Sequence, residues 1–443
     1  MSELEPDRPT LSAWLEAFGN FALDSLDAID RTPASGPVGA AGNAIGALVS
    51  VAIPEEPLAG GVPGIIDRLD RAAAASLFTI GGSYLAYVPG GGLPAAAIGD
   101  FVACMLNRAT GVAAAAPALC RLEADVLAWL GSEFGLPATT RGLLTTGGSI
   151  ANLSAIVTAR FAAFGDGGDY TRARVYASGQ AHHSVLKAVR LAGIPPANMR
   201  TIDVDSRLRL DVEALAAAIA SDRDAGLVPL VVVSAAGTTN SGAIDPLVAI
   251  GELCRRECVW HHVDAAYGGA FVLCDEGRRR LAGIEAADSI TFDPHKGMFL
   301  PYGTGCLLVR DGERLRAAHH MHAPYLQDFE ALDRAGEPPS PTEYGPELSR
   351  DFRGLRLWLP LVLHGAGAFR RALTEKLALA TRLHDGLVAA DVPIEIVDPP
   401  QLSTVTWRLR RHAGETLVHW NARNAAMLAR VNARGRVHLS STV

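Results

Sequence analysis

The sequence contains no long apolar run, and its first residues do not resemble an export signal. No stretch approaches the roughly 18–20 consecutive apolar residues that a helix needs to cross a bilayer. The opening residues MSELEPDRPT are acidic and polar, without the basic start and apolar centre of a secretory signal. We therefore expect a cytoplasmic protein that has no membrane partner.

Cysteine is scarce, with six residues in a chain of 443. The cysteines lack the paired spacing of a zinc ribbon, which favours reduced thiols in a reducing compartment. Cys254 and Cys258 are four residues apart, but no second pair completes the four ligands of a tetrahedral zinc site. The sequence thus predicts no metal centre.

The sequence also has no basic tract. Its 40 basic and 47 acidic residues give a net charge of −7, so nucleic acid is not an expected partner. The apolar fraction of 49% and the charged fraction of 20% are typical of a packed globular protein and exclude wholesale disorder. Because single domains usually hold about 100–200 residues, we expect two or three lobes.

Changes of pattern divide the chain into three predicted regions. Residues 1–75 read as helices and loops that are too few for their own core, so we expect an N-terminal arm that packs on a second subunit. Residues 76–325 alternate short β-rich runs with helical patterns and predict a large α/β domain. Residues 326–443 predict a small α+β domain, with helices at 349–364, 366–389 and 416–432 and strands at 394–397 and 403–409.

Within the large region, the predicted strands are almost entirely apolar. Such strands, separated by helical patterns, favour a mainly parallel sheet with helices on both faces. In sheets of this kind, binding sites form at the carboxyl ends of the strands. The predicted strands are 174–177, 229–234, 259–263, 289–292 and 306–309, and the helices between them are 150–164, 183–192, 212–221 and 246–257.

Two of these strand ends carry glycine and hydroxyl residues. In LLTTGGSIANLSAI, residues 143–156, two glycines and Ser149 open a helix whose first N–H groups and positive end would suit a phosphate. The alternative for the same pattern is an ordinary glycine-containing turn with Ser149 as the N-cap. Thr239 follows another strand in Gly-Thr-Thr, where it either faces the same edge or belongs to a threonine-rich turn.

Two further strand ends carry charged residues. Asp264 follows a buried strand in CVWHHVDAAYGGAF, and a carboxylate there needs a partner, either a protonated ring nitrogen or a structural salt bridge. Lys296 follows a strand in DPHKGMF, among apolar and glycine residues. Such a lysine either extends to solvent or serves as an amine nucleophile whose pKa is lowered by burial.

Together these groups have one joint use, which is to bind pyridoxal 5′-phosphate. A lysine forms an imine with the cofactor, an aspartate keeps the pyridine nitrogen protonated, and a Gly/Ser turn binds the phosphate. The protonated ring is then an electron sink for a carbanion at the α-carbon of an amino acid.

The chain resembles the group II pyridoxal-phosphate-dependent decarboxylases, which include aromatic-L-amino-acid and glutamate decarboxylases. The resemblance runs from about Tyr84 to the end and includes a spacing of 32 residues between Asp264 and Lys296. It implies the type I pyridoxal-phosphate enzyme fold, a homodimer with an interfacial active site, and decarboxylation of an L-amino acid to the amine and CO2. The segments that carry it are SYLAYVPGGGLP, PALCRLEADVLAWL, SGQAHHSVLKA, HVDAAYGGAF, DPHK and SRDFRGLRLWLPL.

The resemblance also implies a role for each matching residue. Lys296 would hold the cofactor as the internal aldimine, and Asp264 would pair with the pyridine nitrogen. His182, in GQAH, would stack on the ring and help to position the substrate carboxylate, and a flat imidazole can also donate a proton. Further cofactor contacts would come from Gly148, Ser149, Thr239, Ala266, Asp293 and His295, and a substrate wall from Tyr87, Pro89 and Gly90.

Some positions depart from the family pattern. Ile150 follows Gly-Gly-Ser where many relatives carry glutamate, and Gly297 follows the lysine where relatives often carry a larger residue.

The family's mobile loop usually presents a tyrosine that protonates the α-carbon. The candidates here are Tyr325 and Tyr344, and Tyr344 is the one proposed as catalytic. Arg353 matches a family arginine whose role here is open. Because the chain stops at VHLSSTV, we expect an incomplete C-terminal domain.

The segments that would line the substrate pocket are small and apolar. Val88 and Gly90 stand where bulkier or hydroxyl-bearing residues are usual in aromatic decarboxylases. The segment 110–116, TGVAAAA, would reach across the dimer and is almost wholly aliphatic. Neither segment has an arginine to pair with a distal carboxylate. We therefore expect an apolar or aromatic L-amino acid rather than an acidic one.

Other outcomes remain open at this point. An aldehyde synthase or a lyase would use the same cofactor, although aldehyde synthases of this family commonly replace the histidine at His182. An inactive homologue that only binds the cofactor is a further alternative. Paired histidines such as His261 and His262 suggest metal binding, but neighbouring residues on a strand point to opposite faces and rarely share one metal.

Overall fold

The computed structural model describes residues 4–50, 53–88, 90–321 and 338–442. Contacts divide it into two compact units, and each is described by itself. The first unit comprises Met1–Pro89 and Arg411–Val443, and the second comprises Gly90–Arg410. The three-part division expected from the sequence was drawn from patterns along the chain and stays a prediction.

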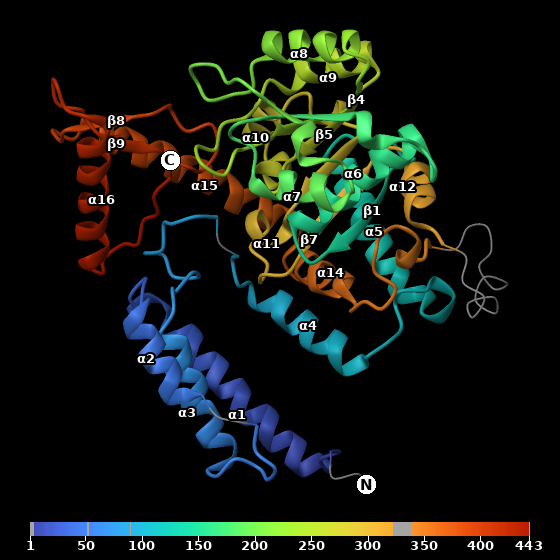
Figure 1. Cartoon of the computed structure of the whole chain (residues 1–443). Helices are drawn as coiled ribbons and strands as arrows, with labels where there is room; N and C mark the ends of the chain where they lie inside the picture. The colour runs from blue at the N-terminus through green and yellow to red at the C-terminus, as the bar shows by residue number, and fades with distance from the viewer. Residues whose placement is uncertain (1–3, 51–52, 89, 322–337, 443) are drawn as a thin grey trace. The chain divides into compact units, whose positions relative to one another are not determined.

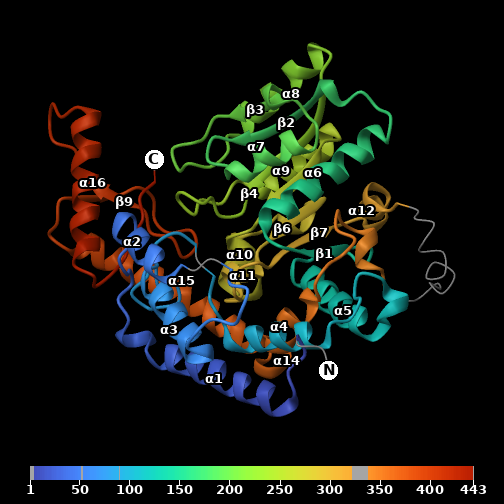
Figure 2. The same ribbon diagram turned by 60° about the horizontal axis from the view of Figure 1, so that its bottom comes forward.

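The second unit is built around a seven-stranded sheet, counted over the described residues, with the order β1-β7-β6-β5-β4-β2-β3. Neighbouring strands are parallel from β6 through β5, β4 and β2 to β3, whereas β7 is antiparallel to both β6 and β1 (Figure 2). The predicted mainly parallel sheet is thus confirmed. The strands are β1 (Arg141–Thr145), β2 (Ala173–Ser178), β3 (Met199–Ile202), β4 (Val228–Ala235), β5 (Trp260–Asp264), β6 (Ser289–Phe292) and β7 (Gly305–Val309).

Helices cover both faces of the sheet. Successive residues of β4 separate into two hydrophobic clusters: Val231 and Val233 pack with α6, α7 and α12, while Val232 packs with α8 and α9. Figure 1 shows α8 and α9 beside each other. Because both faces are buried, the strands are continuously apolar. The helices of this unit are α4 (Pro94–Leu106), α5 (Pro117–Glu133), α6 (Gly148–Phe164), α7 (His183–Leu191), α8 (Val212–Asp224), α9 (Leu247–Glu257), α10 (Asp275–Arg280), α11 (Pro294–Gly297), α12 (Gly312–His319), α14 (Arg353–His364) and α15 (Ala366–Ala389).

Two strands of the sheet had no counterpart among the predicted ones. β1 has the sequence RGLLT, and β3 has the sequence MRTI at the edge of the sheet. Both are short, and each includes residues that a strand pattern does not favour, so pairing with a neighbour decides their conformation. A two-stranded antiparallel sheet of β8 (Ile394–Ile396) and β9 (Trp407–Leu409) matches the predicted C-terminal strands.

The first unit consists of α1 (Arg8–Asp27), α2 (Ala40–Val49), α3 (Gly61–Ala74) and α16 (Leu417–Ala433), with connecting segments. Asp7 caps α1 by accepting a hydrogen bond from the Thr10 N–H at 2.9 Å. The C-terminal segment of the chain lies beside Tyr84. The Tyr84 and His438 rings stack there, with their centroids 5.5 Å apart. Across the described residues, every helix falls short of the length and apolar character that crossing a bilayer requires.

Candidate active site

The ends of neighbouring strands at the carboxyl edge of the large sheet bring the predicted residues together. Asp264 is the last residue of β5, and Asp293 directly follows β6. Lys296 lies on α11, a single helical turn with Pro294 in its first positions. The parallel direction of β5 and β6 places both ends at one edge, as expected for an α/β sheet.

Lys296 is held inside the protein by an acidic neighbour. Its Nζ lies 2.8 Å from Asp293 Oδ2, and 23% of its side chain is exposed. The alternative of a lysine that extends into solvent therefore does not describe this residue. The structure also explains Gly297, because a Cβ there would lie 2.2 Å from the Cβ of Ala270. No larger residue fits at that position without movement of the neighbouring chain.

Asp264 is buried and accepts two hydrogen bonds. Its Oδ1 accepts from the Ala266 N–H at 3.1 Å, and its Oδ2 accepts from Asn152 Nδ2 at 3.0 Å. Within the described part of the chain, no basic side chain forms an ion pair with this carboxylate. The structural salt bridge considered from the sequence is thus absent there, and the carboxylate can still pair with a protonated ring nitrogen.

Asn152, on α6, links three residues of the site and was missed by the sequence analysis. Its Nδ2 donates to Asp264 and also to Ser184 Oγ at 3.1 Å, while its Oδ1 lies 3.0 Å from His262 Nε2. Burial lowers the pKa of His262 to about 4, so the ring is neutral. Trp260 Nε1 donates to Ser289 Oγ, which lies 2.8 Å from His262 Nδ1.

The hydrogen bonds that connect Asp264, Asn152, His262 and Ser289 each have one direction. The Asp264 carboxylate only accepts, so the Asn152 amide directs Nδ2 toward it and presents Oδ1 to His262 Nε2. The neutral imidazole therefore carries its proton on Nε2 and donates to Asn152, and its Nδ1 accepts from the Ser289 hydroxyl. Asn152 is one of several polar residues on the predicted helix 150–164, so the sequence alone did not single it out.

His182 occupies the N-cap of α7. Its Nδ1 accepts from the Ser184 N–H at 3.3 Å and lies 2.7 Å from the Ser184 hydroxyl. Burial lowers the pKa of His182, and the nearby Asp264 carboxylate opposes that shift. The neutral ring therefore carries its proton on Nε2, on the side away from Ser184. The neighbouring His183 is exposed.

The start of α6 lies against Asp293 and Ala266. The N-cap is Gly147, and no side chain caps the helix, so Ser149 is not the capping residue considered from the sequence. A Cβ built on Gly148 would lie 3.0 Å from Asp293 Oδ2 and 3.3 Å from the Ala266 Cβ. Asp293 is 2% exposed, and its Oδ1 has no hydrogen-bond partner. A helix N-terminus and an unpartnered buried oxygen thus face one place.

This set of residues fits pyridoxal phosphate. An amine, an available carboxylate, an imidazole and an uncapped helix N-terminus occur together, as that cofactor requires. His295 precedes Lys296 on α11, and its Nδ1 lies 2.7 Å from the Thr304 carbonyl oxygen. Within the described residues, no group of three or more histidine, cysteine, aspartate or glutamate side chains could hold a metal ion.

Other predicted residues lie elsewhere or outside the described chain. Thr239 is exposed in the turn after β4, whereas its neighbour Thr238 is buried. Tyr344 is 6% exposed and belongs to the hydrophobic cluster over α6 and α12, so its role as a proton donor stays a prediction. Tyr325 and Pro89 lie outside the described residues.

The remaining predicted residues have structural surroundings of their own. Gly90 lies against the Tyr302 ring, because a Cβ there would be 3.2 Å from it. Tyr87 belongs to the first unit, is 70% exposed and has a φ of 54°. Arg353 is buried and donates to both Glu347 oxygens, at 2.6 and 3.0 Å, and to the Leu144 carbonyl at 3.1 Å. These contacts are those of a structural arginine.

Comparisons with known proteins agree with this geometry. The family model described as "Pyridoxal-dependent decarboxylase conserved domain" matches residues 83–410. An aromatic-L-amino-acid decarboxylase of Bacillus atrophaeus is 37% identical over 359 residues, 81% of this chain and 74% of the relative. A phenylacetaldehyde synthase of Petunia hybrida is 32% identical over 82% of this chain and 74% of its own length.

The solved structures show the same fold. The crystal structure of Oryza sativa TDC with PLP and tryptamine superposes with a TM-score of 0.92 and 28% identity, over 100% of this chain and 92% of the other. The predicted type I fold, the cofactor and the decarboxylase activity are thereby confirmed. The chain belongs to the pyridoxal-dependent decarboxylase family and is a pyridoxal-phosphate-dependent amino-acid carboxy-lyase.

Proposed function

We propose that this enzyme decarboxylates an aromatic L-amino acid and that Lys296, Asp264 and His182 carry the reaction. Bound pyridoxal phosphate supplies an electron sink for the electron pair that remains on the substrate's α-carbon when CO2 leaves. The observation that carries the proposal is the convergence of Lys296, the Asp293 carboxylate, the Asp264 carboxylate and the start of α6 at one sheet edge.

In this proposal each side chain has a distinct task. Lys296 attaches the cofactor. Asp264, held by Asn152 and the Ala266 N–H, keeps a proton on the ring nitrogen by pairing an anion with a cation. The N–H groups of Gly148 and Ser149 at the start of α6 hold the phosphate, and Ala266 lies near the ring.

His182 is proposed to position the substrate carboxylate. Its Nδ1 is occupied by Ser184, so the Nε2–H is the group that can donate to a carboxylate. Tyr344 is the residue that we propose as the proton donor to the α-carbon. Gly90 is the residue of the second unit that we propose for the substrate wall.

The aromatic substrate is supported by two of the relatives. The Bacillus atrophaeus protein is named for aromatic L-amino acids, and the Oryza sativa structure contains tryptamine, an aromatic amine. The absence of an arginine from segments 84–90 and 110–116 argues against a substrate with a distal carboxylate.

The test is an assay of all twenty amino acids with separate measurement of CO2, amine, aldehyde and ammonia. We expect equal amounts of CO2 and amine from tryptophan, tyrosine or phenylalanine. Glutamate as the best substrate would contradict the proposal. Aldehyde and ammonia in place of amine would instead identify the activity named for the Petunia hybrida relative.

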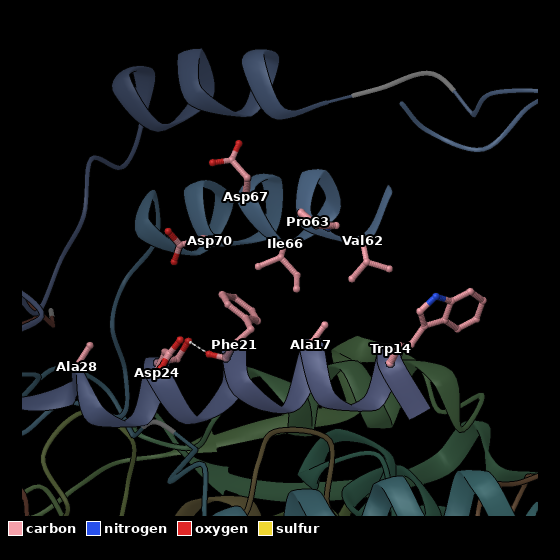
Figure 3. Close-up of a pocket in the computed structure, with 12 residues that line it drawn as sticks. Trp14, Ala17, Phe21, Asp24, Ala28, Val62, Pro63, Ile66, Asp67 and Asp70 are labelled. Atoms are coloured by element: carbon pink, nitrogen blue, oxygen red, sulfur yellow. Dashed lines mark hydrogen bonds between the residues drawn. The ribbon is translucent and has the colours of Figure 1, made fainter. Parts of the chain in front are cut away.

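We also propose that the enzyme is a cytoplasmic homodimer in which the first unit packs on a second copy of the chain. The helices α1, α2 and α3 bury none of their side chains, although they contain large apolar residues. Figure 3 shows Trp14 and Phe21 of α1 facing Val62 and Ile66 of α3 across a groove. Trp14 is 42% exposed. A monomer in light scattering that keeps full activity would contradict the dimer.

A further inference from the structure

Asp293 places an acidic side chain where the proposed function expects an anion. It directly follows β6 and faces Gly148 in the first turn of α6. A Cβ built on Gly148 would lie 3.0 Å from its Oδ2 and 3.1 Å from its Oδ1. The start of α6 has no side-chain cap, and Asp293 Oδ1 has no hydrogen-bond partner although it is buried. One carboxyl oxygen is therefore directed at the proposed phosphate position without a donor of its own.

Lys296 is the counterion of Asp293 in the structure. Its Nζ lies 2.8 Å from Asp293 Oδ2. A lysine that holds the cofactor covalently is no longer a free ammonium group available to this carboxylate. The protein must then neutralise Asp293 in some other way, because a buried carboxylate beside a phosphate brings two negative charges together.

His295 does not provide the replacement charge. Its Nε2 lies 3.9 Å from Asp293 Oδ2, and its Nδ1 lies 2.7 Å from the Thr304 carbonyl oxygen. A carbonyl only accepts, so the neutral ring carries its proton on Nδ1 and turns the lone pair of Nε2 toward Asp293. Burial lowers the pKa of His295, which favours this neutral ring.

The other titratable groups around Asp293 are not cationic either. Asp264, on β5, is a second carboxylate whose charge opposes ionisation of Asp293. The pKa of His182 is lowered by burial, which favours its neutral form, and burial raises the pKa of the Cys306 thiol on β7, which keeps it neutral. Burial raises the pKa of Asp293 itself, and the Lys296 ammonium opposes that shift.

We propose that Asp293 exchanges its ion pair with Lys296 for a proton when the cofactor binds, and that it meets the phosphate as a neutral hydrogen-bond donor. The proton comes from solvent and is taken up on the carboxyl group, with no other bond made or broken. The inference rests on the proposed placement of the phosphate at the start of α6. Asp293 is then neutral in the loaded enzyme, as an asparagine at this position would be without taking up a proton.

The test is the infrared difference spectrum of the full-length holoenzyme minus the cofactor-free protein at pH 8. At this pH the buried Asp245, whose pKa burial raises to about 6, is ionised and does not contribute. We expect the carbonyl band of a protonated carboxyl group to appear on cofactor binding, to shift in D2O, and to be lost in Asp293→Asn. Visible absorbance of the bound cofactor in both proteins confirms that each is loaded.

Asp293→Ser, which has no carboxyl group, is the second variant in case the amide does not fold, and it should also lack the band. Wild-type protein labelled with 13C in the aspartate carboxyl group gives the same answer without a substitution, because the band must shift. A loaded wild-type enzyme without the band, or a band that persists in the loaded variants, overturns the proposal. A chain that does not bind the cofactor at all contradicts both this inference and the proposed function. A loaded, active decarboxylase without the band contradicts this inference alone.

Discussion

Asn152 Nδ2 donates to Asp264 Oδ2 at 3.0 Å, across 112 positions of the sequence. Replacing Asn152 with leucine keeps the branched shape of the side chain but removes this hydrogen bond and the contact with His262. Since hydrogen bonds to charged groups contribute about 1.5–3 kcal/mol, we expect a loss of about 10–100-fold in kcat/KM and weaker cofactor binding. Asn421→Leu on the exposed side of α16 is the matched control. Unchanged kinetics in Asn152→Leu would show that Asp264 does not depend on Asn152.

Asp264→Asn should weaken cofactor binding and slow the reaction. The amide is neutral, so it cannot stabilise a positively charged ring nitrogen, and removal of such an electrostatic group costs on the order of 100-fold in rate. Steady-state kinetics and cofactor titration check the two effects separately. Near-normal activity of the variant would remove the electron-sink argument.

Lys296→Ala should abolish turnover and the visible absorbance of the lysine-bound cofactor. Lys296→Arg is the informative partner, because the guanidinium keeps the positive charge beside Asp293 but stays protonated and is not an amine nucleophile. We expect no recovery of activity in the arginine variant. Measurable turnover by Lys296→Arg would mean that another lysine attaches the cofactor.

Gly297→Ala should destabilise the protein because the new Cβ would lie 2.2 Å from the Cβ of Ala270. Forcing an extra carbon into a closely packed site costs about 1–3 kcal/mol of unfolding free energy. Gly386→Ala is the matched control, since Gly386 lies within α15 with open space around it, and this change should stabilise by about 0.5–1 kcal/mol. Thermal or denaturant unfolding of both variants checks the opposite signs.

Acidification should destabilise the fold through its buried neutral histidines. Burial lowers the pKa of His261 to about 3, so below the ordinary value of about 6.5 the unfolded chain binds a proton that the folded chain does not. Stability contributed by this residue is therefore complete above about pH 6.5 and falls by about 1.4 kcal/mol per pH unit as the pH drops toward 3.

His261→Gln keeps a neutral polar side chain beside Ser234, which lies 2.8 Å from His261 Nε2, but removes the titrating ring. We expect its unfolding free energy to depend less steeply on pH between 6.5 and 4 than that of the wild type. Chemical denaturation across this pH range measures the two slopes. Parallel slopes would indicate that His261 titrates normally in the folded protein.

Much of the fold could be predicted from local patterns. Continuous apolar runs such as 229–234 predicted buried parallel strands, and the structure has β4 there, because strands covered on both faces need no polar alternation. The residues at the ends of these strands could be predicted as well, since Asp264 and Lys296 follow apolar strands and therefore share one sheet edge. The resemblance to the decarboxylase family rests on these same segments.

Only the tertiary structure decided which polar groups satisfy one another. The sequence by itself determined a mainly parallel sheet with Asp264 and Lys296 at one edge, because hydrophobic periodicity encodes burial and strand direction locally. It did not determine that Asn152 joins His262 to Asp264, that Lys296 pairs with Asp293, or that Tyr344 packs in the core. Hydrogen bonds and ion pairs of buried groups depend on angles and distances of a few ångströms between elements far apart in the chain, and these are set only when the elements pack.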